Sequence, residues 1–170
     1  SMYVMQRQVT AQLSGLITGP AELLLAIAVA DGPARTERLS LTLDGVELVT
    51  QEIAAPHGGR LHLVSGVPSG EFAVDYSATV DGIAPIEVPG ALDRIEYARP
   101  SRYCDSDKLM PVAQAEFAGL AGKALLDAVS SWVGAHLSYV AGSSKPIDGA
   151  VDTYLSRQGV CRDYAHLVIA

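Results

Sequence analysis

The chain has 170 residues, of which 49% are hydrophobic and 18% charged, a composition that excludes disordered and fibrous proteins. A chain of this length can bury a stable core without disulfide bonds, as one domain or as two small ones. Its formal net charge is −7 and it has no basic cluster, so a nucleic-acid partner is not expected.

Two observations concern the membrane and the compartment. The most apolar run, residues 21–30, has about half the length that a bilayer-spanning helix needs. Met2 is not followed by the basic and apolar stretches of a secretory signal. We therefore expect no membrane partner and a cytoplasmic location, in which Cys104 and Cys161 both stay reduced.

The beginning of the chain alternates between apolar and polar residues, as β-strands do. A first strand is expected over residues 3–13, and the Ser14-Gly15 pair is expected to end it. Residues 22–30 form a continuous apolar run, which is compatible with a buried strand or with part of a helix.

Turn signals separate the strands that follow. Asp44-Gly45 lies between two alternating segments, a pattern typical of a hairpin because both residues tolerate a positive φ. Segments 61–67 and 72–80 are likewise expected to pair across the Pro-Ser-Gly turn between them. Six or so strands at this spacing predict an antiparallel β-sandwich over residues 1–90.

A proline-rich stretch separates this region from a helical one. Pro85, Pro89 and Pro100 mark the change of pattern, and we place a linker at residues 91–99. Residues 100–170 then read as a second domain with helical periodicity.

Three helices are expected before Cys161. The first covers residues 111–119, with Pro111 in its first turn. The second is the clearest, because apolar residues recur at three- and four-residue spacing over residues 121–137. The third begins after Asp148, which is an acceptable N-cap.

Cys161 follows a helix break and begins a further helix. Backbone N–H groups at a helix N-terminus stabilise a thiolate, and they can also hydrogen-bond the oxyanion formed when a thiolate attacks a carbonyl. Gly159 is expected to allow substrate to approach closely. The position favours a nucleophilic cysteine, and an inert buried thiol is the alternative that spacing alone leaves open.

The residues around Cys161 resemble the nucleophile helix of the bacterial transglutaminase-like superfamily of cysteine proteases. The resemblance is carried by Ala-Val-Asp-Thr-Tyr-Leu at 150–155 and by Arg-Gln-Gly-Val-Cys-Arg-Asp-Tyr-Ala-His-Leu at 157–167. Segments 100–107 and 132–139 are similar to the stretches that lead into the core of that family.

The resemblance implies an α+β protein in which the β-sandwich precedes the helical first part of a transglutaminase-like, papain-like core. It implies that Cys161 is the catalytic nucleophile and that its backbone N–H is one oxyanion donor. The implied substrate is a peptide or protein amide, whose acyl group passes through a thioester to water or to an amine.

In that family a histidine base and an acid that orients it follow the nucleophile. This chain ends on an apolar run nine residues after Cys161, so we expect a truncated core that is inactive by itself. His166 is not expected to replace the base, because five residues along a helix place it about 140° away from Cys161.

Smaller roles are expected for the remaining polar residues. Asp163 is expected to accept hydrogen bonds at the helix start. Arg162 is expected to face solvent rather than a substrate carboxylate, and Cys104 to be a spectator thiol. His57 and His62 have no further ligand at metal-binding spacing, so we expect neither a metal nor a cofactor.

A second hypothesis makes the chain a non-catalytic binding or interaction module. The apolar end of the helix after Cys161 would then be buried by self-association into a homo-oligomer.

Overall fold

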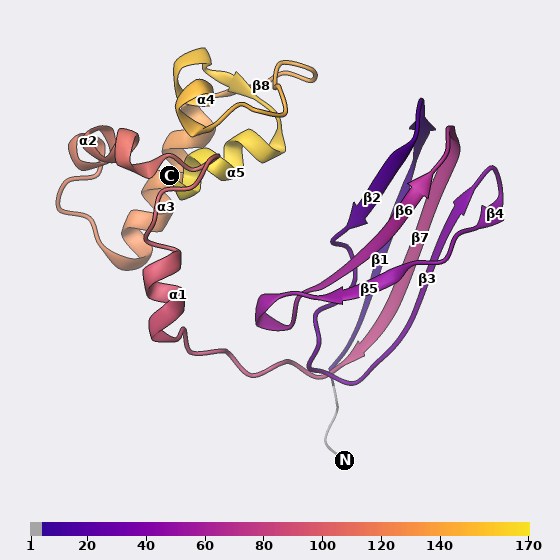
Figure 1. The fold of residues 1–170 in the computed structure, drawn as a ribbon. Coiled ribbons are helices and arrows are strands. Elements are labelled where there is room, and N and C mark those ends of the chain that lie inside the picture. Colours follow the sequence, from indigo (N-terminus) through magenta and orange to yellow (C-terminus); the bar gives the residue numbers. More distant parts are fainter. Residues whose placement is uncertain (1–4) are drawn as a thin grey trace. The chain divides into compact units, whose positions relative to one another are not determined.

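The computed structural model describes residues 5–170, which fall into two units, one ending at Glu87 and the other beginning at Val88 (Figure 1). The N-terminal unit consists of β-strands and the C-terminal unit mainly of helices. The predicted α+β class, with antiparallel strands first and helices second, is confirmed.

Two antiparallel sheets form the N-terminal unit. The larger sheet has the order β1-β7-β3-β4 and the smaller one the order β2-β6-β5. The strands are β1 (Gln6–Ile17), β2 (Ala21–Leu25), β3 (Arg35–Leu43), β4 (Val46–Glu47), β5 (Gln51–Ala54), β6 (Arg60–Val67) and β7 (Gly70–Asp81). A short 3-10 turn, η1 (Pro56–Gly58), precedes β6.

The core of this unit lies between the sheets. Leu41 and Val74 come from the larger sheet, and Val64 and Val67 come from the smaller one. All four side chains are buried in one apolar cluster. Burying a side chain of this size stabilises a fold by about 1.5–3 kcal/mol, so the two sheets depend on each other.

A buried arginine also links the two sheets. Arg60 on β6 donates from Nη1 to Oε2 of Glu37 on β3 at 2.9 Å. Its Nε and Nη2 atoms reach Glu52 at 2.9 and 2.8 Å. The hydroxyl of Tyr76 donates to the same Glu37 oxygen at 2.8 Å. A buried guanidinium is tolerated here because two carboxylates face it.

The first strand differs from its prediction. It does not end at Ser14-Gly15 but continues to Ile17. Gly15 lies opposite Phe72 on β7, and a Cβ atom at Gly15 would lie only 2.7 Å from Cε1 of that ring. The glycine therefore makes room for an aromatic ring and does not turn the chain.

One predicted hairpin is confirmed and the other is wrong. Asp44 and Gly45 have φ values of 49° and 79° and connect β3 to β4 in an antiparallel pair. Strands β6 and β7, in contrast, belong to different sheets. Each presents a row of buried side chains, and the short connection carries the chain across the core from one sheet to the other.

The C-terminal unit is built from five helices and one small parallel ladder within the described residues. The helices are α1 (Ala91–Glu96), α2 (Ser106–Glu116), α3 (Gly122–His136), α4 (Ala150–Ser156) and α5 (Cys161–Ile169). The ladder joins β8 (Ser138–Tyr139) to β9 (Gln158–Gly159). Every helix among residues 5–170 is too short or too polar to span a bilayer.

The helix boundaries show where local signals were misleading. Helix α3 agrees with its prediction to within one residue at each end. Helix α1 occupies most of the stretch predicted to be a linker, where the Asp93 carboxylate caps the Gly90 N–H at 2.7 Å. Helix α2 begins five residues before Pro111, which lies in its interior. Buried Leu109 anchors this extra turn in the core.

Helix α4, in contrast, begins one residue later than predicted. Its N-cap is Gly149, whose N–H donates to the Asp152 carboxylate at 2.9 Å. Asp148 instead accepts a hydrogen bond from the Lys145 N–H at 2.8 Å and stabilises the preceding loop.

One apolar cluster holds four of these helices together. Its buried members are Leu109, Val133, Leu137, Ala150 and Leu167. They come from α2, from α3 and its C-cap, from α4 and from α5, so the cluster fixes the position of α5. The beginning of α5, with Cys161, lies at the surface.

Candidate active site

The parallel ladder of β8 and β9 comes immediately before the candidate site at the start of α5. Helix α4 ends at Arg157, which has the left-handed conformation with φ of 58°. Strand β9 follows, with Gly159 opposite Tyr139, and the Gly159 carbonyl accepts the Val140 N–H at 3.1 Å. These backbone bonds fix the two residues that immediately precede the turn into α5.

Cys161 is the first residue of α5, which is the position predicted from the sequence. Its thiol is free and exposed. Exposure is the opposite of what an inert core thiol would show. In the first turn of α5 the Asp163 N–H already donates to the Val160 carbonyl at 2.9 Å. The N–H groups of Cys161 and Arg162 have no partner within the helix, so they are available to an anion next to the thiol.

Asp163 stabilises the turn that carries the thiol. Its side chain is 1% exposed, and its Oδ2 accepts the Val160 N–H at 2.8 Å. Its Oδ1 accepts the Ser144 hydroxyl at 2.8 Å. The predicted role of Asp163 as a hydrogen-bond acceptor at the helix start is confirmed.

The charge of Asp163 is stabilised by these partners. Burial by itself raises the pKa of the carboxyl group. Hydrogen bonds from Val160, Ser144 and Arg162 outweigh this effect and hold the pKa of Asp163 below its usual value. A buried anion is therefore fixed two residues after Cys161.

Gly159 has a structural role that the sequence did not reveal, and close approach of substrate at this residue stays a prediction. A Cβ atom at this position would lie 2.7 Å from Cβ of Asp163 and 3.0 Å from its Oδ2. The glycine therefore leaves space for the Asp163 carboxylate, which folds back to the Val160 N–H. The sequence Gly-Val-Cys-Arg-Asp is a single structural device, in which the first residue accommodates the last.

The expectation that Arg162 faces solvent is wrong. Its Nη2 atom donates to Ser144 Oγ at 2.7 Å and to the Lys145 carbonyl at 2.6 Å. The same nitrogen lies 3.2 Å from Oδ1 of Asp163. Arg162 thus fastens the loop before α4 against the start of α5, because a planar guanidinium can satisfy several acceptors at once.

Sequence reasoning missed two neighbours of this site. Ser144 lies in a loop without periodicity, and only its contact with Asp163 reveals its role. Tyr103 stacks on His166 with ring centroids 5.3 Å apart and lies 5.9 Å from the guanidinium carbon of Arg162. Neither contact has a signal in the local sequence.

The histidines lie against other side chains. The pairs are His57 with Glu87, His62 with Glu52, His136 with Trp132, and His166 with Tyr103. Cys104 is half-buried, and its N–H donates to the Ser101 hydroxyl at 3.1 Å. Within residues 5–170, no three histidine, cysteine or acidic side chains gather in a way that could hold a metal.

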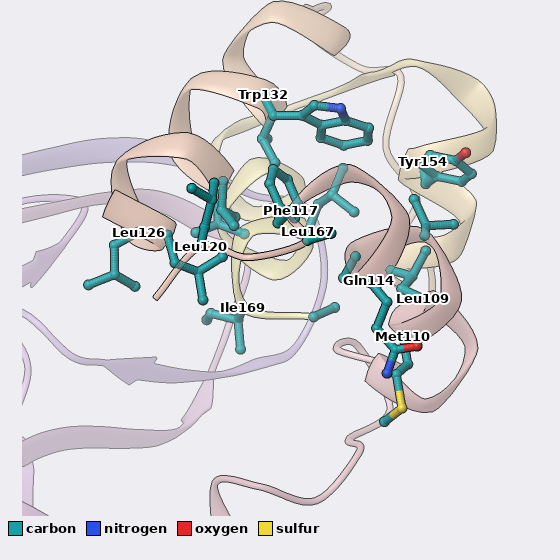
Figure 2. A pocket seen from close by; sticks show the side chains of 18 residues that line it. Leu109, Met110, Gln114, Phe117, Leu120, Leu126, Trp132, Tyr154, Leu167 and Ile169 are labelled. Atoms are coloured by element: carbon teal, nitrogen blue, oxygen red, sulfur yellow. The ribbon is translucent and has the colours of Figure 1, made fainter. Parts of the chain in front are cut away.

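An apolar cavity of about 510 Å³ opens on another part of this unit (Figure 2). Its walls come from α2, α3 and the end of α5, and they include Phe117, Trp132 and Leu167. Cys161 does not line it, so this cavity does not supply the groups that move protons at the thiol. That the apolar end of α5 is covered by self-association stays a prediction.

Comparisons with known proteins support a fold of this type. No protein-family model and no curated protein matches the chain. The structure is similar to a crystal structure described as a "putative cysteine protease" from Cytophaga hutchinsonii, with a TM-score of 0.73 and 25% sequence identity. The similarity covers 98% of this chain and 62% of that one, so the present chain spans under two thirds of its length.

Proposed function

We propose that the chain carries the nucleophile of a cysteine protease or amidase of the transglutaminase-like type. The observation that carries the proposal is the exposed thiol of Cys161 at the first position of α5, on a turn fixed by a buried carboxylate. The similarity to a solved structure described as a "putative cysteine protease" supports it.

The proposed reaction begins when Sγ of Cys161 attacks the carbonyl carbon of an amide. A carbon–sulfur bond forms, and the carbonyl electron pair moves to the oxygen, which the N–H groups of Cys161 and Arg162 at the start of α5 stabilise. The carbon–nitrogen bond then breaks, and the amine leaves after taking up a proton. The product of this half-reaction is a thioester on Cys161.

Hydrolysis of the thioester completes the proposed cycle. Water attacks the acyl carbon, the carbon–sulfur bond breaks, and a carboxylic acid and the thiol are released. We assign the base that activates both the thiol and the water to a histidine outside these 170 residues. The basis for this assignment is the resemblance to a family in which the base follows the nucleophile along the chain, and the similar solved structure is longer than this chain. On this proposal the 170-residue chain accepts an activated acyl group but does not turn over amides.

Acylation with p-nitrophenyl acetate tests the nucleophile. The ester has a good leaving group and needs no general acid, so Cys161 is expected to take up the acetyl group and release p-nitrophenolate. Intact mass spectrometry with peptide mapping locates the thioester. Cys161→Ser should abolish the rapid release of p-nitrophenolate, whereas Cys104→Ser, the matched control, should retain it. Equal acylation of both cysteines would contradict the proposal.

A further inference from the structure

Among the strands that the structure describes in residues 5–87, β1 is a long sheet edge with a partner strand on one side only. It pairs with β7 on one side and is the last strand of its sheet (Figure 1). The pairing runs without a bulge from Gln6 opposite Asp81 to Ile17 opposite Gly70. On alternate residues of this twelve-residue strand the N–H and C=O groups therefore point away from β7, to an open edge.

The edge lacks the features that usually prevent pairing with another chain. Natural edge strands carry charges, prolines or bulges for this purpose. β1 contains no proline and one charged residue, Arg7. The Arg7 guanidinium is turned to its own chain, where it donates to the Gly82 carbonyl at 2.6 Å. The remainder of the edge is uncharged.

The inner face of β1 is also incompletely covered. Val9 lies opposite Ala78 and Leu13 lies opposite Val74, so all four side chains point to the same face of the sheet. Ala78 and Val74 are 4% and 2% exposed, whereas Val9 and Leu13 are 40% and 46% exposed. The smaller sheet thus covers β7 but leaves an apolar stripe of β1 in contact with solvent.

We propose that this edge is a homodimer interface, in which two copies of β1 pair antiparallel around a two-fold axis at Ala11. In this register Val9 of each copy faces Leu13 of the other, and the two apolar stripes become continuous. Arg7 faces Gly15, so no like charges oppose each other. A shift by one residue would turn the partner's apolar stripe to the solvent face. A shift by two residues would keep the face but place Val9 opposite Ala11 or Gly15 instead of Leu13.

A hollow beside Val9 supports a second copy as the occupant. It has a volume of about 310 Å³ and is lined mainly by apolar residues, among them Val29, Val80 and Ile83. Side chains directly opposite each other across two strands have Cβ atoms about 5 Å apart. Leu13 of the second copy therefore lies next to Val9, at the hollow, and brings an apolar side chain to it.

Two measurements test the interface in a Cys104→Ser, Cys161→Ser background. Ala11→Cys should form an intermolecular disulfide on mild oxidation, because Ala11 faces its own copy. In this register Gln12 lies opposite Thr10 of the second copy, so the two Gln12 residues are more distant diagonal neighbours. Gln12→Cys should therefore cross-link at least tenfold more slowly. Equal cross-linking at the two positions, or none at Ala11→Cys, would overturn the proposal.

Sedimentation of surface variants gives the second measurement. The unmodified chain should dimerise, and Val9→Lys should weaken dimerisation at least tenfold. Val46→Lys, on exposed β4 at the opposite edge of the same sheet, should leave it unchanged. Circular dichroism confirms that each variant is folded. A monomer at all concentrations, or a dimer that only Ile169→Asp at the end of α5 dissociates, would refute the β1 interface.

Discussion

Oδ2 of Asp163 accepts the backbone N–H of Val160 at 2.8 Å, across the turn that presents Cys161. Cys161 lies between the two residues that this bond joins, so the bond restrains the backbone on both sides of the thiol-bearing residue. We infer that the direction of the Cys161 side chain depends on this buried carboxylate. Asp163 is therefore a positioning residue for the proposed reaction.

Removal of this carboxylate should affect both stability and reactivity. Asp163→Ala removes one acceptor from each of the Val160 N–H, the Ser144 hydroxyl and the Arg162 guanidinium. Loss of a buried, hydrogen-bonded charge should lower the free energy of unfolding by about 3 kcal/mol. Chemical denaturation measures this loss.

The matched control is Asp152→Ala. Asp152 caps the Gly149 N–H at 2.9 Å in the same geometry but is exposed and lies on α4. Asp152→Ala should lower the free energy of unfolding by about 1 kcal/mol and leave the acylation rate of Cys161 unchanged. Asp163→Ala should slow acylation under conditions in which the variant is still folded. An unchanged rate would show that Asp163 is structural only.

Gly159→Ala should disturb the same turn by a different route. The added Cβ would lie 2.7 Å from Cβ of Asp163, so either the side chain or the backbone has to move. We expect a loss of about 1–3 kcal/mol in the free energy of unfolding and slower acylation of Cys161. Thermal and chemical denaturation, with the acylation assay, measure both effects.

Gly134→Ala provides the contrast. Gly134 is exposed within α3, and a Cβ atom there would meet nothing within 4 Å. Alanine in the interior of a helix is favoured over glycine by about 1 kcal/mol, so this variant should be more stable than the original chain. A stabilising Gly159→Ala would mean that the Asp163 contact is not as close as described.

The features that could be predicted from the sequence are those with local causes. Asp44 and Gly45 define a hairpin by their own tolerance of positive φ, and they do so in the structure. Cys161 at the start of a helix follows from the glycine before it and the acidic residue after it. Such signals need only a few neighbouring residues, so the sequence contains them.

Features with distant causes could not be predicted. The assignment of β6 and β7 to different sheets depends on which strands pair with them elsewhere in the chain. The contacts of Ser144 and Arg162 around Asp163 connect segments that are 18 or 19 residues apart and have no periodicity. Proline favours the first turn of a helix, so Pro111 predicts a helix start, whereas the packing of Leu109 extends the helix before it.

Arg162→Lys should release the loop before α4. A lysine ammonium cannot bind Ser144, the Lys145 carbonyl and Asp163 in the planar arrangement that the guanidinium uses. Hydrogen exchange at residues 143–146 should become faster, with a loss of about 1 kcal/mol in unfolding free energy. Arg94→Lys, on exposed α1, should change neither quantity. Unchanged exchange in Arg162→Lys would show that the loop is held by other contacts.

The stability of the chain should fall in acid because of Glu37. Hydrogen bonding to Arg60, opposed by burial and assisted by Arg35 and Tyr76, lowers the pKa of Glu37 from 4.5 to about 2. The carboxylate is therefore favoured in the folded state. Its contribution is fully present above pH 4.5 and is lost as the pH falls towards 2.

Replacement of this carboxylate tests the pH dependence. The contribution of Glu37 is at most about 3 kcal/mol. In urea denaturation at several pH values between 7 and 2, Glu37→Gln should be less stable than the original chain at pH 7, because Arg60 loses a charged partner. The difference should shrink as the pH falls below 4.5, since protonated Glu37 and glutamine are then alike. For Glu47→Gln, at an exposed position on β4, the free energy of unfolding should change with pH in the same way as that of the original chain. If the free energy of unfolding of Glu37→Gln also followed that of the original chain down to pH 2, the ion pair between the sheets would not be the source of the acid sensitivity.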